Sequence, residues 1–159
     1  MITKATIKDV DEIANIEKIC FPIKEAATKE QIEKRIKSYN DYFYILKENN
    51  EIISFINGII SNNKNLTDEM YENTSIHNKN EDWYFIFGVD TLPKYQHKGY
   101  AKKMMNYVID DLKRQNKKGI VLTCKKELIT FYEQFGYINE GISESIHGNV
   151  TWYQMRLTF

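Results

Sequence analysis

Apolar and polar residues follow two recurring patterns along the chain, one with the period of a strand and one with the period of a helix. Short apolar runs and strict alternation favour strands, whereas apolar residues three and four positions apart favour helices. The first pattern predicts strands over residues 2–7, 42–46, 52–60, 83–89, 119–124, 136–142 and 150–157. The second predicts helices that begin near residues 9 and 28, and helices over residues 101–115 and 126–135. Strands and helices that interleave in this way indicate a mixed α/β sandwich.

Local signals mark several of the element ends. Asp9 is the expected N-cap of the first helix because Glu12 follows three residues later, and Thr28 with Gln31 forms a second capping box. The Asn-Asn pair at 49–50 separates two strand-like runs, which predicts a β-hairpin. These signals place the starts of the first two helices and the first hairpin turn.

Two features interrupt the regular pattern. The Asn-Gly pair at 57–58 lies inside a strand-like run and suggests a β-bulge, because glycine weakens a strand ladder. Residues 61–81 are mostly polar with no clear period, and loops this long in compact domains are usually functional or disordered. Leu66, Met70 and Tyr71 are the residues that could anchor a short helix there.

The composition is that of a globular protein without a strong net charge. Its 159 residues predict one domain, 1–159, with no linker and no internal repeat. Lys plus Arg equals Asp plus Glu at 22 each, so no basic field attracts nucleic acid or an anionic membrane. No apolar run approaches the ~20 residues that span a bilayer, and the N-terminus has no signal-peptide core. Cys20 and Cys124 lie far apart without metal-ligand spacing, which predicts reduced thiols, no metal and a cytoplasmic protein.

The stretch that opens the predicted helix at 101–115 has the features of an anion site. It comprises Gln96, His97, Lys98, Gly99, Tyr100 and Ala101. The first amides of a helix have no internal partner, and the helix dipole places partial positive charge there. Gly99 also removes a Cβ where a phosphate would approach. The stretch is neither a Walker A loop nor the full glycine fingerprint of dinucleotide folds, and it suits a pyrophosphate.

The spacing Gln-x-x-Gly-x-Ala in this stretch resembles the acyl-CoA signature of the GNAT superfamily of N-acetyltransferases. A second block places four side chains on one face of a predicted helix, namely Leu128, Phe131, Tyr132 and Phe135. Gly136 then lets the chain leave the helix as a strand. This block resembles the GNAT segment that closes the acetyl-CoA site.

Three further features resemble the arylalkylamine (serotonin) N-acetyltransferase branch of that superfamily. They are Cys124 just before the second block, the loop that carries Phe21 and Glu25, and the run at 55–58 ahead of a long loop. The resemblance covers nearly the whole chain. It implies the GNAT fold, a mixed, mostly antiparallel sheet of about seven strands with helices on both faces and a central splay that pantetheine fills. It also implies acetyl-CoA as the co-substrate.

The resemblance assigns cofactor contacts to two segments. The strand end would pair with pantetheine, its Val89 N–H would polarise the thioester carbonyl, and the amides of residues 97–102 would bind the pyrophosphate. The implied cofactor residues are Val89, Asp90, Thr91, Gln96, His97, Lys98, Gly99, Tyr100, Ala101, Lys102 and Tyr132. Lys98, Lys102 and Lys103 could add charge near the phosphates, or could be ordinary solvated surface.

Tyr132 matches the tyrosine that the family uses to protonate the departing CoA thiolate. A phenol with a pKa of about 10 is a suitable donor when it lies within hydrogen-bond reach. From its spacing alone, Tyr132 could equally be a core tyrosine on an amphipathic helix. Cys124 is expected to be a buried structural thiol, because nothing basic is placed to activate it.

The general base is not evident from the sequence. The animal arylalkylamine enzymes have two histidines where this chain has Phe85 and Phe87, and phenylalanine cannot accept a proton. A primary amine resembles lysine, with a pKa of about 10, so a route for deprotonation is needed. The possible replacements are Glu25, Glu69, His77 and His147, each of which could also be an ordinary surface residue.

Aromatic residues make up 13% of the chain and could line a pocket for an apolar amine. The residues expected to contact the substrate are Phe21, Glu25, Phe55, Phe85 and Phe87. Aromatic rings would fit an aryl group or a cation held over a ring face, although most aromatic residues simply build cores.

The sequence thus predicts an acetyl-CoA-dependent N-acetyltransferase that acts on a small primary amine by direct attack on the thioester. Its expected partners are acetyl-CoA and the amine, with neither nucleic acid nor membrane, and it is expected to be a monomer or a homodimer. Two alternatives stay open. One is an acetyltransferase of a protein N-terminus or lysine, and the other is a non-catalytic acyl-CoA sensor, suggested by the missing histidines.

Overall fold

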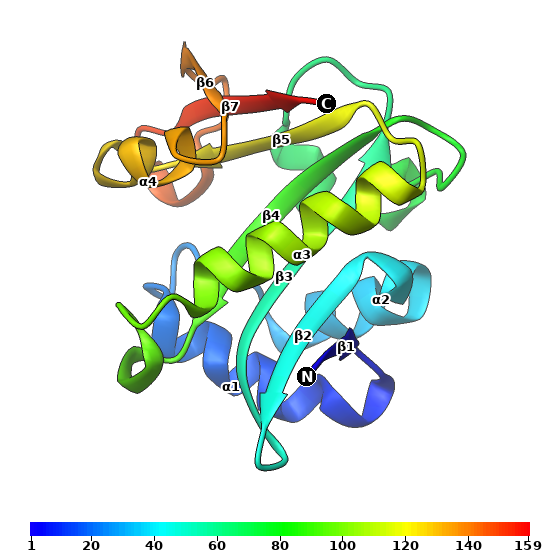
Figure 1. Ribbon diagram of the computed structural model, residues 1–159, viewed down its shortest axis with the longest axis vertical. Coiled ribbons are helices and arrows are strands. Elements are labelled where there is room, and N and C mark those ends of the chain that lie inside the picture. Colours follow the sequence, from blue (N-terminus) through cyan, green and yellow to red (C-terminus); the bar gives the residue numbers. More distant parts are fainter. The chain divides into compact units, whose positions relative to one another are not determined.

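The computed structural model describes residues 1–159 and contains one seven-stranded sheet with the strand order β1-β2-β3-β4-β5-β7-β6 (Figure 1). The strands are β1 (Ile2–Lys4), β2 (Phe43–Glu48), β3 (Glu51–Ser61), β4 (Trp83–Thr91), β5 (Gly119–Cys124), β6 (Ile138–Ile142) and β7 (Tyr153–Thr158). The α-helices are α1 (Val10–Cys20), α2 (Lys29–Tyr39), α3 (Tyr100–Arg114) and α4 (Ile129–Glu133). β4 and β5 pair in parallel, whereas β1–β2, β2–β3, β5–β7 and β6–β7 pair antiparallel. The predicted mixed, mostly antiparallel GNAT sheet is confirmed.

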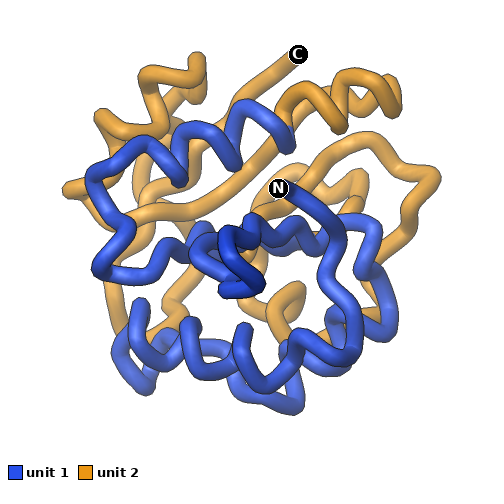
Figure 2. The backbone as a smooth tube through the Cα atoms, turned by 60° about the horizontal axis from the view of Figure 1, so that its bottom comes forward, with its two compact units in different colours: residues 1–58, 88–108 blue, residues 59–87, 109–159 orange.

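The chain forms two compact units, each assembled from two separate stretches of sequence (Figure 2). Unit 1 comprises Met1–Gly58 and Gly88–Val108, and unit 2 comprises Ile59–Phe87 and Ile109–Phe159. Strands β3 and β4 and helix α3 each contribute residues to both units. The two units are described separately below.

In unit 1, strands β1, β2 and β3 form an antiparallel meander whose register runs from Ile2↔Leu46 to Phe43↔Asn57. The predicted hairpin turns at Asn49 and Asn50, with φ values of 51° and 65°. Asparagine tolerates this left-handed region, which a two-residue hairpin loop requires. The core that α1 and α2 build with these strands includes Ile13, Ile16, Ile32, Ile36, Phe43 and Phe55.

The two predicted helix starts in unit 1 have different outcomes. The Thr28–Gln31 capping box is present, with Gln31 N donating to Thr28 Oγ1 at 3.2 Å. The first box is displaced, because Thr6 N donates to Asp9 Oδ2 at 2.8 Å and a 3₁₀ turn over Ile7–Asp9 precedes α1. Asp9 therefore closes the box as its acidic member and caps no amide of α1 with its side chain. The register irregularity between β2 and β3 lies at Leu46/Lys47, not at 57–58.

In unit 2, β7 lies between β5 and β6, with the register Gly119↔Thr158 at one end of β5 and Cys124↔Tyr153 at the other. The polar segment after β3 carries the predicted short helix, η3 (Asp68–Tyr71), anchored by the fully buried Leu66 and Met70. The helix predicted over 126–135 is shorter than expected, because a 3₁₀ turn occupies Lys126–Leu128 and α4 ends at Glu133. Leu128 is 45% exposed and does not share the buried face expected for it.

The parallel pairing of β4 with β5 begins at Trp83↔Gly119 and stops at Ile86↔Leu122, whereas β4 itself continues to Thr91. The end of β4 therefore runs five residues beyond its register with β5, from Phe87 to Thr91. None of the helices is both long and apolar enough to cross a bilayer. No group of three or more His, Cys, Asp or Glu side chains is arranged to hold a metal ion.

Candidate active site

The anion-binding turn predicted from the sequence lies in unit 1, between η5 (Pro93–Tyr95) and the start of α3. His97 and Gly99 have φ values of 61° and 87°, so the chain makes its turn through two left-handed residues. Gln96 N donates to Pro93 O, and the next backbone hydrogen bond in this stretch runs from Lys103 N to Gly99 O. The first amides of a helix have no partner within that helix, so the start of α3 presents hydrogen-bond donors at this turn.

Gly99 has open space around it. A Cβ built on Gly99 would meet no heavy atom within 4 Å. The turn is tied to the end of β4, because Gln96 Nε2 donates to Thr91 O at 3.0 Å. Lys98 is exposed and lies 6.0 Å from the centre of the Tyr95 ring. The turn is therefore an accessible, donor-rich cradle, and these residues fit the pyrophosphate of a coenzyme.

The end of β4 is held by side chains of unit 1. Thr91 O accepts from Cys20 Sγ at 3.3 Å as well as from Gln96, and Asp90 O accepts from Ser54 Oγ at 2.7 Å. Burial raises the pKa of the Cys20 thiol to about 11, so Cys20 acts as a hydrogen-bond donor rather than a nucleophile. Two of the three residues predicted to pair with pantetheine, Asp90 and Thr91, are thus held by hydrogen bonds from side chains.

Two carboxyl groups that the sequence analysis did not single out meet in unit 1. Asp90 is 1% exposed and Glu17 is 7% exposed, and neither oxygen of Asp90 receives a hydrogen bond from a donor. Burial raises the pKa of Asp90 well above its usual value, and the neighbouring Glu17 carboxyl raises it further. Glu17 Oε2 accepts a hydrogen bond from Ala27 N at 2.7 Å. We refer to Glu17 and Asp90 as the carboxyl pair.

Both members of the pair left a signal in the sequence. Asp90 is a charged residue inside an otherwise apolar strand, and Glu17 lies four residues after Ile13, on the buried side of α1. Charged residues are almost never fully buried unless they are paired or functional. The Asp90 assignment made from sequence concerned its backbone, whereas the structure draws attention to its side chain.

Tyr132 lies in unit 2, is 6% exposed, and makes edge-on contacts with Phe131 and Tyr137 at centroid distances of 5.1 and 5.7 Å. Cys124 is 2% exposed, and burial raises the pKa of its thiol to about 11. A neutral, buried thiol agrees with the structural role expected for Cys124.

The four candidate bases occupy different environments. His77 Nδ1 accepts from Ile60 N at 3.0 Å, and the exposed Glu69 accepts from Asn73. Glu25 is half-buried in the turn after α1, where its amide donates to Pro22 O. His147 stacks on Tyr71 at 4.7 Å, and Tyr71 in turn lies 5.0 Å from Phe87. His147 is thus the one of the four that ring contacts connect to the end of β4.

The aromatic residues predicted to line a substrate pocket separate by burial. Phe55 is 1% exposed and stacks on Phe43 in the core of unit 1, and Phe85 is completely buried in unit 2. Phe21 and Phe87 are half-buried. Of the predicted site, unit 1 holds Phe21, Glu25, Phe55, Val89, Asp90, Thr91 and residues 96–102, and unit 2 holds Phe85, Phe87 and Tyr132. Burial gives Phe55 and Phe85 core positions and leaves Phe21 and Phe87 as the accessible rings.

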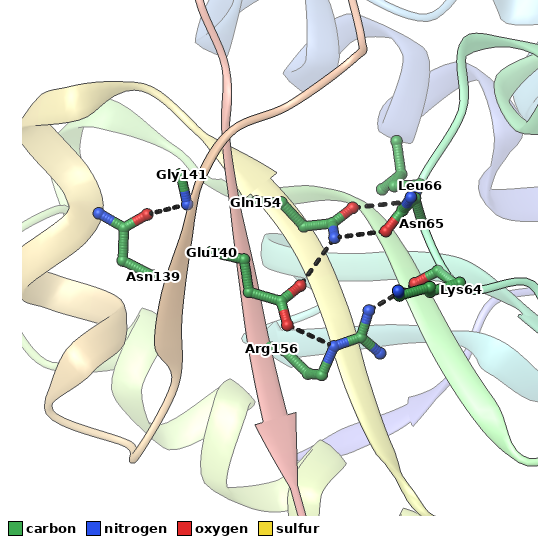
Figure 3. Close-up of polar contacts among 8 residues, drawn as sticks. All are labelled: Lys64, Asn65, Leu66, Asn139, Glu140, Gly141, Gln154 and Arg156. Atoms are coloured by element: carbon green, nitrogen blue, oxygen red, sulfur yellow. Dashed lines mark hydrogen bonds and ion pairs between the residues drawn. The ribbon is translucent and has the colours of Figure 1, made fainter.

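A second polar cluster that sequence reasoning missed lies in unit 2, centred on Gln154 of β7 (Figure 3). Gln154 Oε1 accepts from Leu66 N at 3.0 Å, and Gln154 Nε2 donates to Asn65 and Glu140 at 3.0 and 2.8 Å. Arg156 Nε donates to Glu140 Oε2 at 2.8 Å. The cluster borders a pocket of about 370 Å³ lined by Lys64, Asn65, Glu140, Ile142, Ser143, Glu144 and Gln154. We refer to these contacts as the Gln154 network.

Comparisons with known proteins agree with this fold. The structure matches the loading GNATL domain of CurA from Lyngbya majuscula with a TM-score of 0.89 and 14% identity. The match covers 99% of this chain and 96% of that domain. The ribosomal-protein-S18-alanine N-acetyltransferase from Escherichia coli matches with a TM-score of 0.74 and 15% identity, covering 99% and 92%. The PaiA N-acetyltransferase from Thermoplasma acidophilum, solved in complex with coenzyme A, matches with a TM-score of 0.73 and 14% identity, covering 100% and 98%. Comparison with curated protein sequences finds no match.

The model of the acetyltransferase (GNAT) family matches residues 10–137. The chain belongs to this family, and at that level it is an acetyltransferase whose acyl donor is acetyl-CoA.

Proposed function

We propose that the protein transfers the acetyl group of acetyl-CoA to a small primary amine of the arylalkylamine kind. The observation that supports the aromatic acceptor most directly is the stack of Phe87, Tyr71 and His147 in unit 2, with centroid distances of 5.0 and 4.7 Å. All three residues are half-buried, so part of each remains accessible. Ring faces hold aryl groups by stacking and ammonium groups by cation–π attraction.

Each step of the proposed mechanism uses a residue of this chain. The amides of 97–102 and the end of β4 would hold acetyl-CoA, which supplies an acetyl thioester. Val89 N–H would polarise the thioester carbonyl while the neutral amine attacks it directly. The new C–N bond forms, the C–S bond breaks, and Tyr132 would give its phenol proton to the departing thiolate. The buried thiols of Cys20 and Cys124 take no part.

The first test is the release of free CoA, read with a thiol reagent, from purified protein with acetyl-CoA and a panel of amines. The panel contains tryptamine, phenethylamine, spermidine, an aminoglycoside and a lysine peptide. We expect release with tryptamine or phenethylamine and a thermal shift with acetyl-CoA alone. Release with the lysine peptide only would favour the alternative of a protein acetyltransferase. A thermal shift without release from any amine would contradict the small-amine proposal.

Tyr132→Phe tests the assignment of the proton donor. We expect kcat to fall about 100-fold, in the range typical of general acids, while the thermal shift with acetyl-CoA is unchanged. Tyr137→Phe is the matched control, because Tyr137 is a second buried tyrosine 5.7 Å from Tyr132. Equal kcat values for wild type and Tyr132→Phe would exclude the phenol as the donor.

A further inference from the structure

The carboxyl pair lies behind a residue without a side chain. Gly88 of β4 is half-exposed, and a Cβ built on it would lie 3.0 Å from Asp90 Oδ1, 3.5 Å from Asn57 Nδ2 and 3.9 Å from Glu17 Oε1. Three buried polar side chains therefore converge on the position that a Gly88 side chain would occupy. A Cβ at 3.0 Å from Asp90 Oδ1 would be too close, so the absence of a side chain at Gly88 leaves room for the carboxyl pair beside the strand.

Gly88 also adjoins the residue that would polarise the thioester carbonyl. Gly88 directly precedes Val89, whose N–H is the proposed donor to the thioester carbonyl, and consecutive Cα atoms are about 3.8 Å apart. The same face of the strand end carries Asp90, two residues after Gly88. A proton acceptor at Asp90 would thus lie beside the place where an amine attacks.

The charges around the pair show how many protons it can hold. Glu17 and Cys20 face Asp90 from α1, and Arg35 faces it from α2. Arg35 is 4% exposed and donates from Nη1 to Asn57 Oδ1 at 3.1 Å. Its positive charge balances one carboxylate and no more. The second carboxyl is stable without its proton only when another cation is near, since burial disfavours an uncompensated charge.

We propose that the Glu17–Asp90 pair, which lies beside Gly88, accepts the proton of the acceptor ammonium and so replaces the histidines that this chain lacks. The inference rests on the proposed function, because it assumes an amine acceptor. It assigns a catalytic role to two side chains that the family resemblance did not suggest, and it needs no base at Phe85 or Phe87.

The step balances in protons and charge. The ionised pair and the ammonium R–NH₃⁺ become the pair with one shared proton and the neutral amine R–NH₂. Both sides carry the same total charge, but the product side has fewer isolated charges, which a buried site favours. The neutral amine then attacks the thioester, and the nitrogen of the adduct loses its extra proton to solvent. Tyr132 protonates the departing thiolate and regains a proton from solvent, and the pair releases its proton to solvent before the next cycle.

Two amines that differ in the acidity of their ammonium groups test the proposal. Phenethylamine and β,β-difluorophenethylamine have nearly the same shape, but the fluorines lower the pKa of the ammonium, so more of the second amine is neutral without a base. We expect Asp90→Asn and Glu17→Gln to lower kcat/KM for phenethylamine about 100-fold at pH 7. The loss should be much smaller for the fluorinated amine. A purely structural role would lower both values equally, and that result would overturn the proposal.

Three further variants complete the experiment. Gly88→Ala should lower kcat/KM for phenethylamine by about tenfold or more, because its Cβ would lie 3.0 Å from Asp90 Oδ1 and displace that carboxyl group. Asp11→Asn is the control on α1, since Asp11 is an exposed carboxylate paired with Lys29, and its kcat/KM should not change. If His147→Gln lowers kcat/KM for phenethylamine more than for the fluorinated amine, and Asp90→Asn does not, His147 is the base and the proposal is wrong.

Failure of the inference is distinguishable from failure of the proposed function. If the wild type acetylates phenethylamine and both carboxyl variants retain its rate and its pH profile, only the inference is overturned. If the wild type acetylates neither amine, the proposed function is overturned and the proton role falls with it. A thermal shift with acetyl-CoA, measured for every variant, identifies any variant whose loss comes from misfolding or from a damaged cofactor site.

Discussion

The two units each contain a polar cluster of similar composition, but the clusters differ in burial and in hydrogen bonding. The cluster of unit 1 is buried, whereas in unit 2 Gln154 is buried and Glu140 is exposed. The carboxyl pair with Arg35 and Asn57 in unit 1 leaves both oxygens of Asp90 without a donor. The Gln154 network in unit 2 joins Asn65, Glu140 and Arg156 so that each Glu140 oxygen accepts a hydrogen bond (Figure 3). An arginine, an asparagine and a carboxylate thus occur in both clusters, but both carboxylate oxygens accept hydrogen bonds in Glu140 and neither does in Asp90.

The pKa directions follow from this difference. Burial raises the pKa of Asp90, whereas the effect of burial on Glu140 is outweighed by hydrogen bonds from Arg156 and Gln154, which lower its pKa. A satisfied network adds stability and fixes geometry. A carboxyl group without a donor costs stability, and such groups persist mainly where the protein uses them. Unit 1 therefore holds the reactive cluster and unit 2 the supporting one, and four predictions can break or sharpen this contrast.

The prediction with the largest expected effect compares one glycine from each unit. Gly99 and Gly141 have φ values of 87° and 91°, and a Cβ on either would meet nothing within 4 Å. Glutamate at either position costs about the same backbone strain. Only Gly99→Glu should place a negative charge in the phosphate cradle and weaken acetyl-CoA binding, by about 100-fold or ~2.7 kcal/mol. Calorimetric titration with acetyl-CoA checks this, and equal affinities for the two variants would show that the phosphates bind elsewhere.

The second prediction breaks the supporting cluster. Gln154→Leu removes the acceptor for Leu66 N and the donors to Asn65 and Glu140 in a part of unit 2 that is buried. A buried polar group left without a partner costs about 1–3 kcal/mol, and Leu66 N is such a group here, so the free energy of unfolding should fall by roughly 1–3 kcal/mol. Urea denaturation measures the loss. Gln115→Leu, at the exposed residue directly after α3, is the matched control and should change little.

The third prediction has the opposite sign and concerns the reactive cluster. Because the pKa of Asp90 is raised on folding, the folded wild type loses stability as pH rises from about 4, the unfolded value, through the folded pKa. Asp90→Asn has no such proton to lose. The melting temperature of Asp90→Asn relative to wild type should therefore increase with pH between pH 4 and pH 8, at roughly 2–4 °C for each kcal/mol gained. A difference that stays constant with pH would mean that Asp90 titrates normally.

The fold was largely predictable because its signals are local. Strand periodicity, the Asn49–Asn50 turn and the Thr28–Gln31 box each involve neighbouring residues, and all three appear in the structure. Errors arose where tertiary packing decides. Leu128 lies on a 3₁₀ turn and faces solvent. Asp9 is the N-cap residue of α1, as predicted, but its side chain binds Thr6 rather than an amide of α1.

The candidate site was predictable only where a motif carries it. The donor-rich turn at 96–101 is contiguous in sequence, so its spacing identified it. The carboxyl pair joins α1 to the end of β4, and the Gln154 network joins β6, β7 and the segment after β3. A single sequence does not show that such distant residues meet. The one local sign was an acidic residue on an apolar face, which indicates burial but not the partner.

The prediction with the smallest expected effect compares Arg35 of unit 1 with Arg156 of unit 2. Arg35 lowers the pKa of Asp90, so Arg35→Gln should raise it, and the acid limb of the pH profile of kcat/KM for phenethylamine should move to higher pH. Arg35→Lys keeps the charge, so its acid limb should lie close to that of the wild type. Arg156→Gln, its counterpart in unit 2, should lower stability by leaving Glu140 without its ion pair but leave the limb where it is. A limb that moves with Arg156 and not with Arg35 would reverse the assignment of the reactive and the supporting cluster.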